Sequence, residues 1–469
     1  MLCDSATPSL RRSPRRQGLD QFFGLMSKRM KSCHRAAKLA PKRKPGMFPF
    51  DSIPENVLFM ILQLLPLRDA LRTSVLAQNL LRAWRFYPNL EFTTKVLGLN
   101  KRVHKERRRA KFVRRVNSIV RHHAGTGVKS FAIKHNLNND KYDNYLDRWI
   151  YFAVSSGAKE LTLDLCPRRS IHHSYIQYSF PSSNFAAARP TCVEHLKLCY
   201  CFLRQPTTFN GLRNLRTLDL SLVHITQEDL ENLLSCALSL EQLKLSECPQ
   251  IDHLKISEML CKLTHLDIRY IRLNTLEIRA RNLVTFNYCG WSKIKIVLCE
   301  ASLVKEARFE LSSGDAADYA FSELAPLMPN LETLYLVGYT QMIIPARDPT
   351  NKFCSLKHLE MKMHMSSRKY GLLCLVSFLD AALFLENFIV HLCEPSPFIG
   401  EETVLRRVEK REPHRKLKLA KMTGYAGDKS SIELALHILE NSSVLECLTL
   451  DPRLDKFAYK YIYSDALVS

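Results

Sequence analysis

Apolar residues crowd more than one face of the segment from Ser52 to Pro66, which reads SIPENVLFMILQLLP. Ser52 followed three residues later by Glu55 is a helix-capping pattern, and Pro54 is tolerated in a first turn because the N–H it lacks has no helical partner there. Apolar positions 57, 61 and 64 line one side of this helix, and positions 58, 62 and 65 line the next. A helix of this kind must bury most of its circumference, so we expect a surface that covers it.

Two more short helices are predicted before residue 92. LRDALRTSVLAQ has apolar residues on one helical face after Pro66 interrupts the first helix, and NLLRAWRFYPNLEF has them before Pro88 ends the third. Three helices within residues 48–92 cannot bury all of these side chains among themselves, because so small a chain buries too little surface. The surplus must face a partner or another part of the chain.

An alternating phrase recurs through the rest of the chain, in forms such as VEHLKL, LRTLDL, LEQLKL and LTHLDI. Its first core residue falls at positions 196, 218, 243, 266, 276, 286, 334, 359 and 448. Steps of 22, 25 and 23 residues are typical of leucine-rich repeats, and the two steps of 10 predict strands on both sides of one coil. One such unit cannot bury its own apolar face, so stacked repeats must supply the core.

Helical spacing appears between the predicted strands. In TQEDLENLLSCA, Thr226 can cap a helix that has Asp229 in its first turn, and NYLDRWIYFAVS predicts another helix over residues 144–155. The longest apolar run, from Leu372 to Leu385, is interrupted by Asp380 and is shorter than the ~20 residues that a bilayer requires. It predicts a buried helix and no membrane span.

These patterns predict an α/β fold in which a small three-helix unit precedes a curved leucine-rich-repeat solenoid of parallel strands, with helices and loops on the convex side. We expect a basic disordered tail over residues 1–46, the helical unit over 47–92, a basic helical bridge and repeat cap over 93–160, leucine-rich repeats over 161–385 and further repeats over 386–469. The predicted concave face carries charges of both signs, which indicate no single class of ligand, at Lys197, Asp219, Lys244, Asp267 and Glu277.

The basic charge of the chain is local. The formal net charge of the 469 residues is +22, but residues 1–46 hold twelve Lys/Arg against two acids and residues 101–115 hold nine against Glu106. In the tail, PKRKP with Lys42, Arg43 and Lys44 is typical of a nuclear-import or nucleic-acid-binding segment, and a solvated tail is the alternative. We therefore expect the protein in the nucleus, the cytoplasm or both.

The second basic segment predicts a basic amphipathic helix, because Val103, Phe112, Val116 and Ile119 have partly helical spacing. The simplest interpretation of its charges is a solvated helix face, and phosphate binding is the alternative. The near-neutral remainder of the chain makes nucleic acid an unlikely main partner, and binding through two basic segments alone would be independent of sequence.

Catalytic and metal-binding patterns are missing from the sequence. The fifteen cysteines contain no C-x-x-C pair and no secretory signal precedes them, so we expect a reducing compartment and idle or buried thiols. No G-x-S-x-G, H-E-x-x-H or dinucleotide-binding glycine turn occurs, and the adjacent histidines in RHHAG and IHHSY point apart. We expect no enzyme activity, no metal site and no cofactor.

The stretch FDSIPENVLFMILQLLPLRDALRTSVLAQNLLRAW resembles an F-box. In that family the helical unit docks on a Skp-type adaptor, which connects it with a cullin scaffold and a ubiquitin-conjugating enzyme. Two positions depart from the pattern, since Leu80 replaces its first Trp and Asn56 replaces a common acidic residue. The resemblance assigns docking or core positions for adaptor binding to Ile53, Pro54, Val57, Leu58, Ile61, Leu65, Pro66, Leu71, Val75 and Trp84.

A wider resemblance covers residues 48–452. GVKSFAIKH, YLDRWIYFAVSSGAKELTLDL and HRKLKLAKMTGYAGDKSSIELALHILENSSVLECLTLDP together are similar to plant F-box proteins with leucine-rich repeats and an FBD-like C-terminal region. This implies a substrate-recognition adaptor of a cullin-based SCF-type ubiquitin ligase, whose solenoid captures an unidentified target protein. The alternative is a nuclear nucleic-acid-binding or scaffold protein that uses its basic segments.

Overall fold

The computed structural model describes residues 53–74, 76–99, 102–137, 139–167, 178–182, 192–204, 211–298, 303–312, 316–340, 352–365, 372–392 and 413–453. The chain divides into two compact units, with the boundary between His224 and Ile225. Several predicted residues lie outside the described ranges, namely Lys42, Arg43, Lys44, Ser52 and Val75.

The described part of unit 1 starts with three short helices, as the sequence predicts. They are α2 (Glu55–Leu64), α3 (Leu67–Thr73) and α4 (Gln78–Trp84). Pro54 and Pro66 are the N-cap residues of α2 and α3, and both have an extended ψ that starts the helix directly after them. The buried core of this helical unit consists of Leu58, Leu62, Leu67, Ala70, Leu71, Leu80, Ala83 and Trp84.

Parallel strands follow the helical unit within unit 1. In spatial and chain order they are β1 (Asn89–Thr93), β2 (Ser130–Lys134), β3 (Glu160–Asp164), β5 (His195–Cys199) and β7 (Thr217–Ser221), with β4 (Ser179–Phe180) and β6 (Phe202–Leu203) paired separately. Strand pairing therefore starts before residue 161, with β1 at the end of the predicted helical unit and β2 inside the predicted bridge. The repeated Leu-x-Leu phrase does not predict these strands, because β1 buries Leu90 and Phe92 and β2 buries Phe131 and Ile133.

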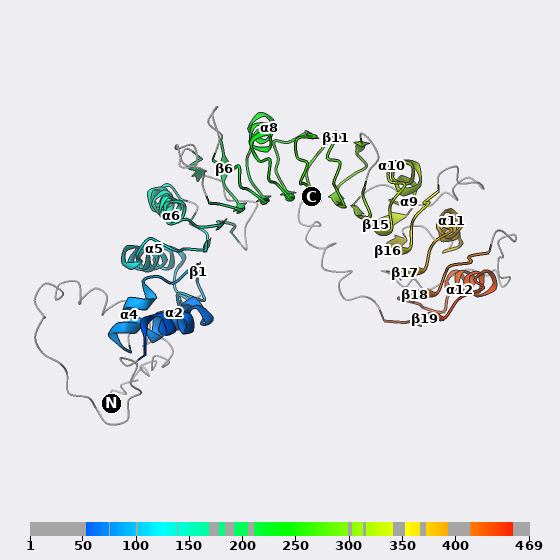
Figure 1. Ribbon diagram of the computed structural model, residues 1–469. Coiled ribbons are helices and arrows are strands. Elements are labelled where there is room, and N and C mark those ends of the chain that lie inside the picture. The colour runs from blue at the N-terminus through cyan, green and yellow to red at the C-terminus, as the bar shows by residue number, and fades with distance from the viewer. Residues whose placement is uncertain are drawn as a thin grey trace, which may run out of the picture. The chain divides into compact units, whose positions relative to one another are not determined.

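The connections between these first strands are helical. They are α5 (Lys105–His122), η2 (Asp140–Tyr142) and α6 (Asp143–Ser155). Helices α5 and α6 lie side by side in Figure 1, each following one strand of unit 1. The basic helix and the helix over residues 144–155 are thus confirmed, and they are the helical parts of the first repeats.

The described residues of unit 2 form two sets of parallel strands. The larger has, in order, β8 (Gln242–Ser246), β10 (His265–Arg269), β12 (Thr285–Gly290), β14 (Glu306–Leu311), β15 (Thr333–Thr340), β16 (His358–Met365), β17 (Asn387–Leu392), β18 (Leu419–Thr423) and β19 (Cys447–Asp451). The smaller contains β9 (His253–Ile256), β11 (Thr275–Ile278) and β13 (Lys295–Leu298). Strands β10 and β12 pair directly while β11 pairs in the other sheet, so the prediction from the steps of 10 is confirmed.

Helices cover one side of the larger sheet in unit 2, as Figure 1 shows for α8, α11 and α12. The helical segments are α8 (Gln227–Cys236), α9 (Ala316–Tyr319), η4 (Ala320–Leu324), α10 (Ala325–Leu327), η5 (Leu372–Leu375), α11 (Val376–Ala381) and α12 (Lys429–Asn441). Thr226 caps α8 as predicted, since its hydroxyl accepts the N–H of Asp229 at 3.1 Å and donates to the Asp229 carboxylate at 2.8 Å. Parallel strands with helices on one side confirm a leucine-rich-repeat solenoid.

The helix predicted from Leu372 to Leu385 is shorter than expected. Only α11 is α-helical, after the 3-10 turn η5, and its C-cap is Ala382. The chain must turn there to reach β17 at Asn387, so Leu383 and Phe384 are exposed in the turn. Within the described part of the chain, no helix is both long and apolar enough to cross a membrane.

Candidate functional site

The three-helix unit fixes one side of α2 and leaves another side open. Leu58 and Leu62 are buried on the side where α2 packs against α4, and the Tyr87 hydroxyl donates to the Leu65 carbonyl at 2.7 Å, which holds the end of the helix. Burying an aliphatic side chain of this size contributes about 1.5–3 kcal/mol. The orientation of α2 is therefore set by its buried side.

The open side of α2 is also apolar. Val57, Met60, Ile61 and Leu64 are exposed, Met60 to 65% and Leu64 to 85%. Their spacing of three, four and seven residues puts them on one helical face, which we call the α2 apolar face. Apolar anchors at this spacing fit the hydrophobic groove of another protein.

The predicted adaptor-binding residues divide between this face and the core. Val57 and Ile61 belong to the α2 apolar face, Pro54 and Pro66 are exposed at the ends of the helix, and Ile53 and Leu65 are half-buried. Leu58, Leu71 and Trp84 are fully buried inside the unit. These three residues can support docking by maintaining the fold, and they have no surface with which to touch a partner.

Two exposed residues were missing from the predicted set, Met60 and Leu64. The helical spacing already grouped Leu64 with Val57 and Ile61, so the signal was present in the sequence. The sequence does not show which of the two apolar faces of this helix is buried. That choice depends on where α3 and α4 pack.

Charged residues of the helical unit form two ion pairs. A guanidinium nitrogen of Arg82 lies 3.5 Å from a carboxylate oxygen of Glu55, and both side chains are largely exposed. Arg72 and Asp69 form a second pair at 3.3 Å. An exposed pair such as Arg82–Glu55 contributes about 0–1 kcal/mol to stability, so it adds little to the fold of the helical unit.

The outward residues of the strands form a further candidate surface in each unit, and within each unit many of their charged side chains are paired with one another. In unit 1, Lys197 Nζ lies 2.5 Å from Asp219 Oδ2, and in unit 2 Arg269 Nε lies 2.8 Å from Asp267 Oδ1. Glu277 was predicted on the same face, but it lies on β11 in the smaller sheet and pairs with Arg279. The reason is the 10-residue step, which carries the chain to the other side of the coil.

Farther along unit 2 the outward face adds an aromatic ring and a histidine. The Arg308 guanidinium carbon lies 3.9 Å from the centre of the Tyr335 ring, and His391 Nε2 lies 3.1 Å from Glu360 Oε1. His391 Nδ1 also contacts the Thr423 hydroxyl at 2.8 Å. Such a row of mixed, mutually paired groups suits contact with a protein surface better than capture of one ion.

Ion pairs also follow the beginning of the strands in unit 2. Glu332 pairs with Lys357 at 2.8 Å and with Lys305 at 3.3 Å, and Lys418 pairs with Glu386 at 3.0 Å. The hydrogen bond from Lys357, followed by that from Lys305, lowers the pKa of Glu332. The alternating signs join successive repeats and leave little net charge at this edge.

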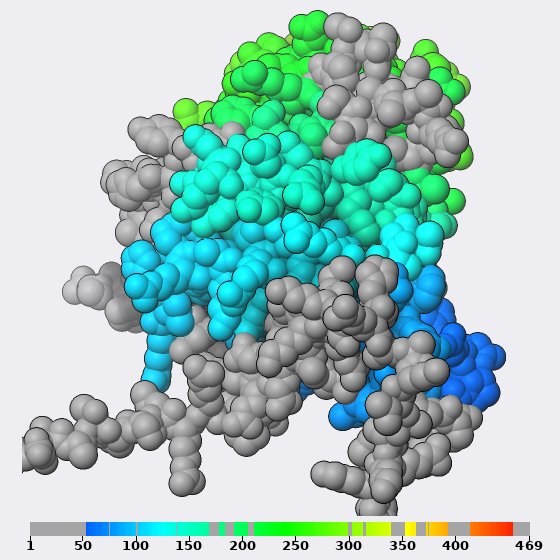
Figure 2. Space-filling view, turned by 90° about the vertical axis from the view of Figure 1, so that its left-hand side faces the viewer, coloured from blue at the N-terminus to red at the C-terminus, as the bar shows by residue number. Residues whose placement is uncertain are grey.

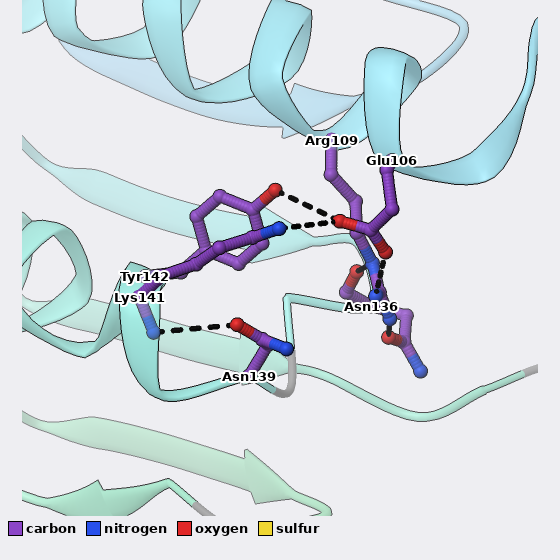
Figure 3. Close-up of polar contacts among 6 residues, drawn as sticks. All are labelled: Glu106, Arg109, Asn136, Asn139, Lys141 and Tyr142. Carbon is purple, nitrogen blue, oxygen red and sulfur yellow. Dashed lines mark hydrogen bonds and ion pairs between the residues drawn. The ribbon is translucent and has the colours of Figure 1, made fainter.

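A polar network anchors α5 to the segment before α6 (Figure 3). Glu106 accepts from Lys141 Nζ at 2.7 Å and from Arg109 at 2.6 Å, and the Tyr142 hydroxyl lies 3.3 Å from it. The buried Arg109 also donates to the Asn136 carbonyl at 2.8 Å. The hydrogen bond from Lys141, together with Arg109, lowers the pKa of Glu106 to about 2.

We expect Glu106→Gln to destabilise unit 1 by about 1–2 kcal/mol at pH 7, because Arg109 would stay buried without its carboxylate while solvent screens the exposed part of Glu106. A pKa lowered by folding gives stability that is present above the ordinary pKa of Glu, 4.5, and is lost as the pH falls toward 2. Denaturant unfolding of both proteins from pH 7 to pH 3 should therefore show the difference shrinking below pH 4.5. Glu91→Gln, which breaks the exposed pair with Lys134, is the control and should cost less than about 0.5 kcal/mol. An equal loss in both variants, or a difference that grows on acidification, would contradict the assignment.

The described residues contain no group of three or more His, Cys, Asp or Glu side chains placed to hold a metal ion. Two buried or half-buried thiols are poorly suited to act as nucleophiles. Burial raises the pKa of Cys289 to about 12, and a hydrogen bond with Cys166, followed by burial, raises the pKa of Cys199.

Known proteins resemble the chain over most of its length. The family described as At1g61320/AtMIF1, LRR domain, matches residues 119–464. F-box/FBD/LRR-repeat protein At1g13570 of Arabidopsis thaliana is 26% identical over 422 residues, which cover 86% of this chain and 90% of that protein. Putative F-box/LRR-repeat protein At5g54820 is 24% identical over 74% of this chain and 76% of its own length, and FBD-associated F-box protein At1g61320 is 24% identical over 58% and 55%, both from the same plant.

Proposed function

Because the chain belongs to the plant family of F-box proteins with leucine-rich repeats and an FBD region, we propose that it is the substrate-recognition adaptor of an SCF-type ubiquitin ligase. In this function the α2 apolar face docks on a Skp-type adaptor and, through it, on a cullin. The repeats hold a target protein. The partners carry out ubiquitin transfer, and this chain contributes the proximity of enzyme and target.

The observation that carries the proposal is the α2 apolar face. Its side chains project from a helix whose opposite side is locked into the helical unit, so the face is rigid before docking. Preorganised apolar residues bind without a large cost of ordering. Each of Met60 and Leu64 would contribute about 1.5–3 kcal/mol if a partner buried it completely.

The test is co-purification of the full chain with a plant Skp-type adaptor. We expect the Ile61→Glu/Leu64→Glu variant to lose at least about 100-fold in affinity, because two carboxylates would have to enter an apolar groove. Both positions are exposed, so the variant should fold as the parent does. Leu439→Glu, at an exposed position of α12 in unit 2, is the matched control and should bind like the parent.

Two results would overturn the proposal. One is failure of the folded parent chain to bind the adaptor. The other is equal binding by the parent and the α2 variant, which would show that docking uses a different surface.

A further inference from the structure

Helix α5 presents a straight ridge of arginines to solvent. Arg107, Arg114 and Arg121 are exposed and follow one another at intervals of seven residues, which is nearly two helical turns. At 1.5 Å per residue, neighbouring arginines lie ~10 Å apart along the axis and the whole ridge spans ~21 Å. We call these three residues the α5 arginine ridge. Helices α5 and α6 belong to the face of the molecule that Figure 2 turns toward the viewer.

The opposite side of α5 fixes this ridge in place. Phe112, Val116 and Ile119 are buried, and two further arginines are buried with them. Arg109 is held by Glu106 and the Asn136 carbonyl, and Arg115 donates to the Leu97 carbonyl. The helix thus uses two of its arginines for structure and holds the ridge on a rigid support.

The ridge arginines have no counter-charge within the described part of the chain. Arg107, Arg114 and Arg121 form no hydrogen bond or ion pair with any residue that the structure describes. Glu106 is the one acidic residue of α5, and Lys141 and Arg109 already occupy it. In contrast, the charges on the strand faces are largely paired. A set of unpaired guanidinium groups is available for an external anion.

The neighbours of the ridge indicate the kind of anion. Ala110, Asn117 and Ser118 are the small or polar side chains beside it on α5, and the aromatic residue of the helix, Phe112, is buried. A protein interface normally has an apolar or aromatic centre, and single-stranded nucleic acid normally stacks on exposed aromatic rings. The ridge offers neither. Contact with a phosphate backbone requires neither, and guanidinium groups bind phosphate through two hydrogen bonds.

We infer that the α5 arginine ridge binds the phosphate backbone of double-stranded nucleic acid, independently of base sequence. A duplex carries one negative charge per about 1.7 Å of axis, so phosphates are available along the whole ridge. The sequence alone favoured a solvated face for this helix. The structure favours phosphate binding instead, because it shows that Arg109 and Arg115 are buried and bonded while the three arginines of the ridge are exposed and unpaired. The inference does not depend on adaptor docking, which uses a different helix.

The test measures binding of the full chain to a mixed-sequence DNA duplex of about 24 base pairs by fluorescence anisotropy at several salt concentrations. The ridge variant is Arg107→Gln/Arg114→Gln/Arg121→Gln, in which glutamine keeps the helix propensity of arginine. The slope of log K against log salt should become shallower by about 2.7, because three phosphate contacts are lost at about 0.9 each. The basic tail is the same in every protein compared and cannot produce this difference.

The matched control is Arg272→Gln/Arg281→Gln/Arg415→Gln, which removes the same charge from exposed positions of unit 2. This control should keep the parent slope. Equal loss in both triple variants, or an unchanged slope in the ridge variant, would overturn the inference. A poly-glutamate chain that competes as well as the duplex at equal charge would also overturn it, since the ridge would then bind acidic protein. An RNA duplex that competes as strongly as the DNA duplex would support recognition of the phosphate backbone alone.

Discussion

Leu58→Glu is expected to unfold the three-helix unit, whereas Leu64→Glu, less than two turns away on the same helix, should leave it intact. Leu58 is 1% exposed, in a helix that packs against α4, while Leu64 is 85% exposed. Loss of a buried leucine costs about 2–5 kcal/mol, and an unpaired carboxylate in the same place adds to this cost. The sum is a large part of the 5–15 kcal/mol that typically stabilises a domain.

Hydrogen exchange of the full chain, followed by mass spectrometry, measures this difference. The amides of α2, α3 and α4 should lose protection in Leu58→Glu and keep it in Leu64→Glu, and unit 2 should be unaffected in both. Retained protection in Leu58→Glu would mean that the side chain is not in the core. The result also bears on docking, because a Leu58 variant that fails to bind an adaptor would report unfolding and not a lost contact.

Gly290→Ala is expected to destabilise unit 2 by about 2–3 kcal/mol. A methyl group on Gly290 would overlap the ring of Tyr288 and would lie 2.8 Å from its Cε1 atom. The ring cannot easily move, because it is buried beside Phe309 and its hydroxyl donates to the Ser292 carbonyl at 3.2 Å. Glycine at the end of β12 is therefore required by the close approach of this ring.

Thermal unfolding of the full chain checks this expectation, with Asn287→Ala as the control. Asn287 lies on the same strand but points outward, so its replacement should change stability by less than about 0.5 kcal/mol. If Gly290→Ala unfolds at the parent temperature, the Tyr288 ring must have another position available. If the control loses as much stability as Gly290→Ala does, the loss comes from any substitution in β12 and not from overlap with the Tyr288 ring.

The sequence does not predict the left-handed turn that recurs after several strands. Tyr200, Leu222, Glu247 and Tyr270 each follow the last residue of a strand, and all four have φ between 50° and 66°. Residues with side chains adopt this left-handed conformation rarely, and none of the four is the glycine that usually signals it. The stacking of repeats holds them there, since the N–H of Tyr200, Glu247 and Tyr270 each bonds to a carbonyl of the next strand.

The sequence by itself determined the local elements of this protein. The spacing of apolar residues predicted α2, α5 and α6, the 10-residue steps predicted a second sheet at β11, and Thr226 with Asp229 predicted the start of α8. These features depend on residues close together in the chain, whose periodicity is visible without knowledge of the fold.

Only the tertiary structure decided which side of each element is buried. Helix α2 has two apolar sides in the sequence, and packing against α4 leaves Leu58 buried and Leu64 exposed. The arginines of α5 look alike in the sequence. In the structure Arg109 is buried and donates to the Asn136 carbonyl, while Arg114 is exposed to solvent. Contacts between segments far apart in the chain make these choices, and a one-dimensional pattern contains no information on which segments will meet.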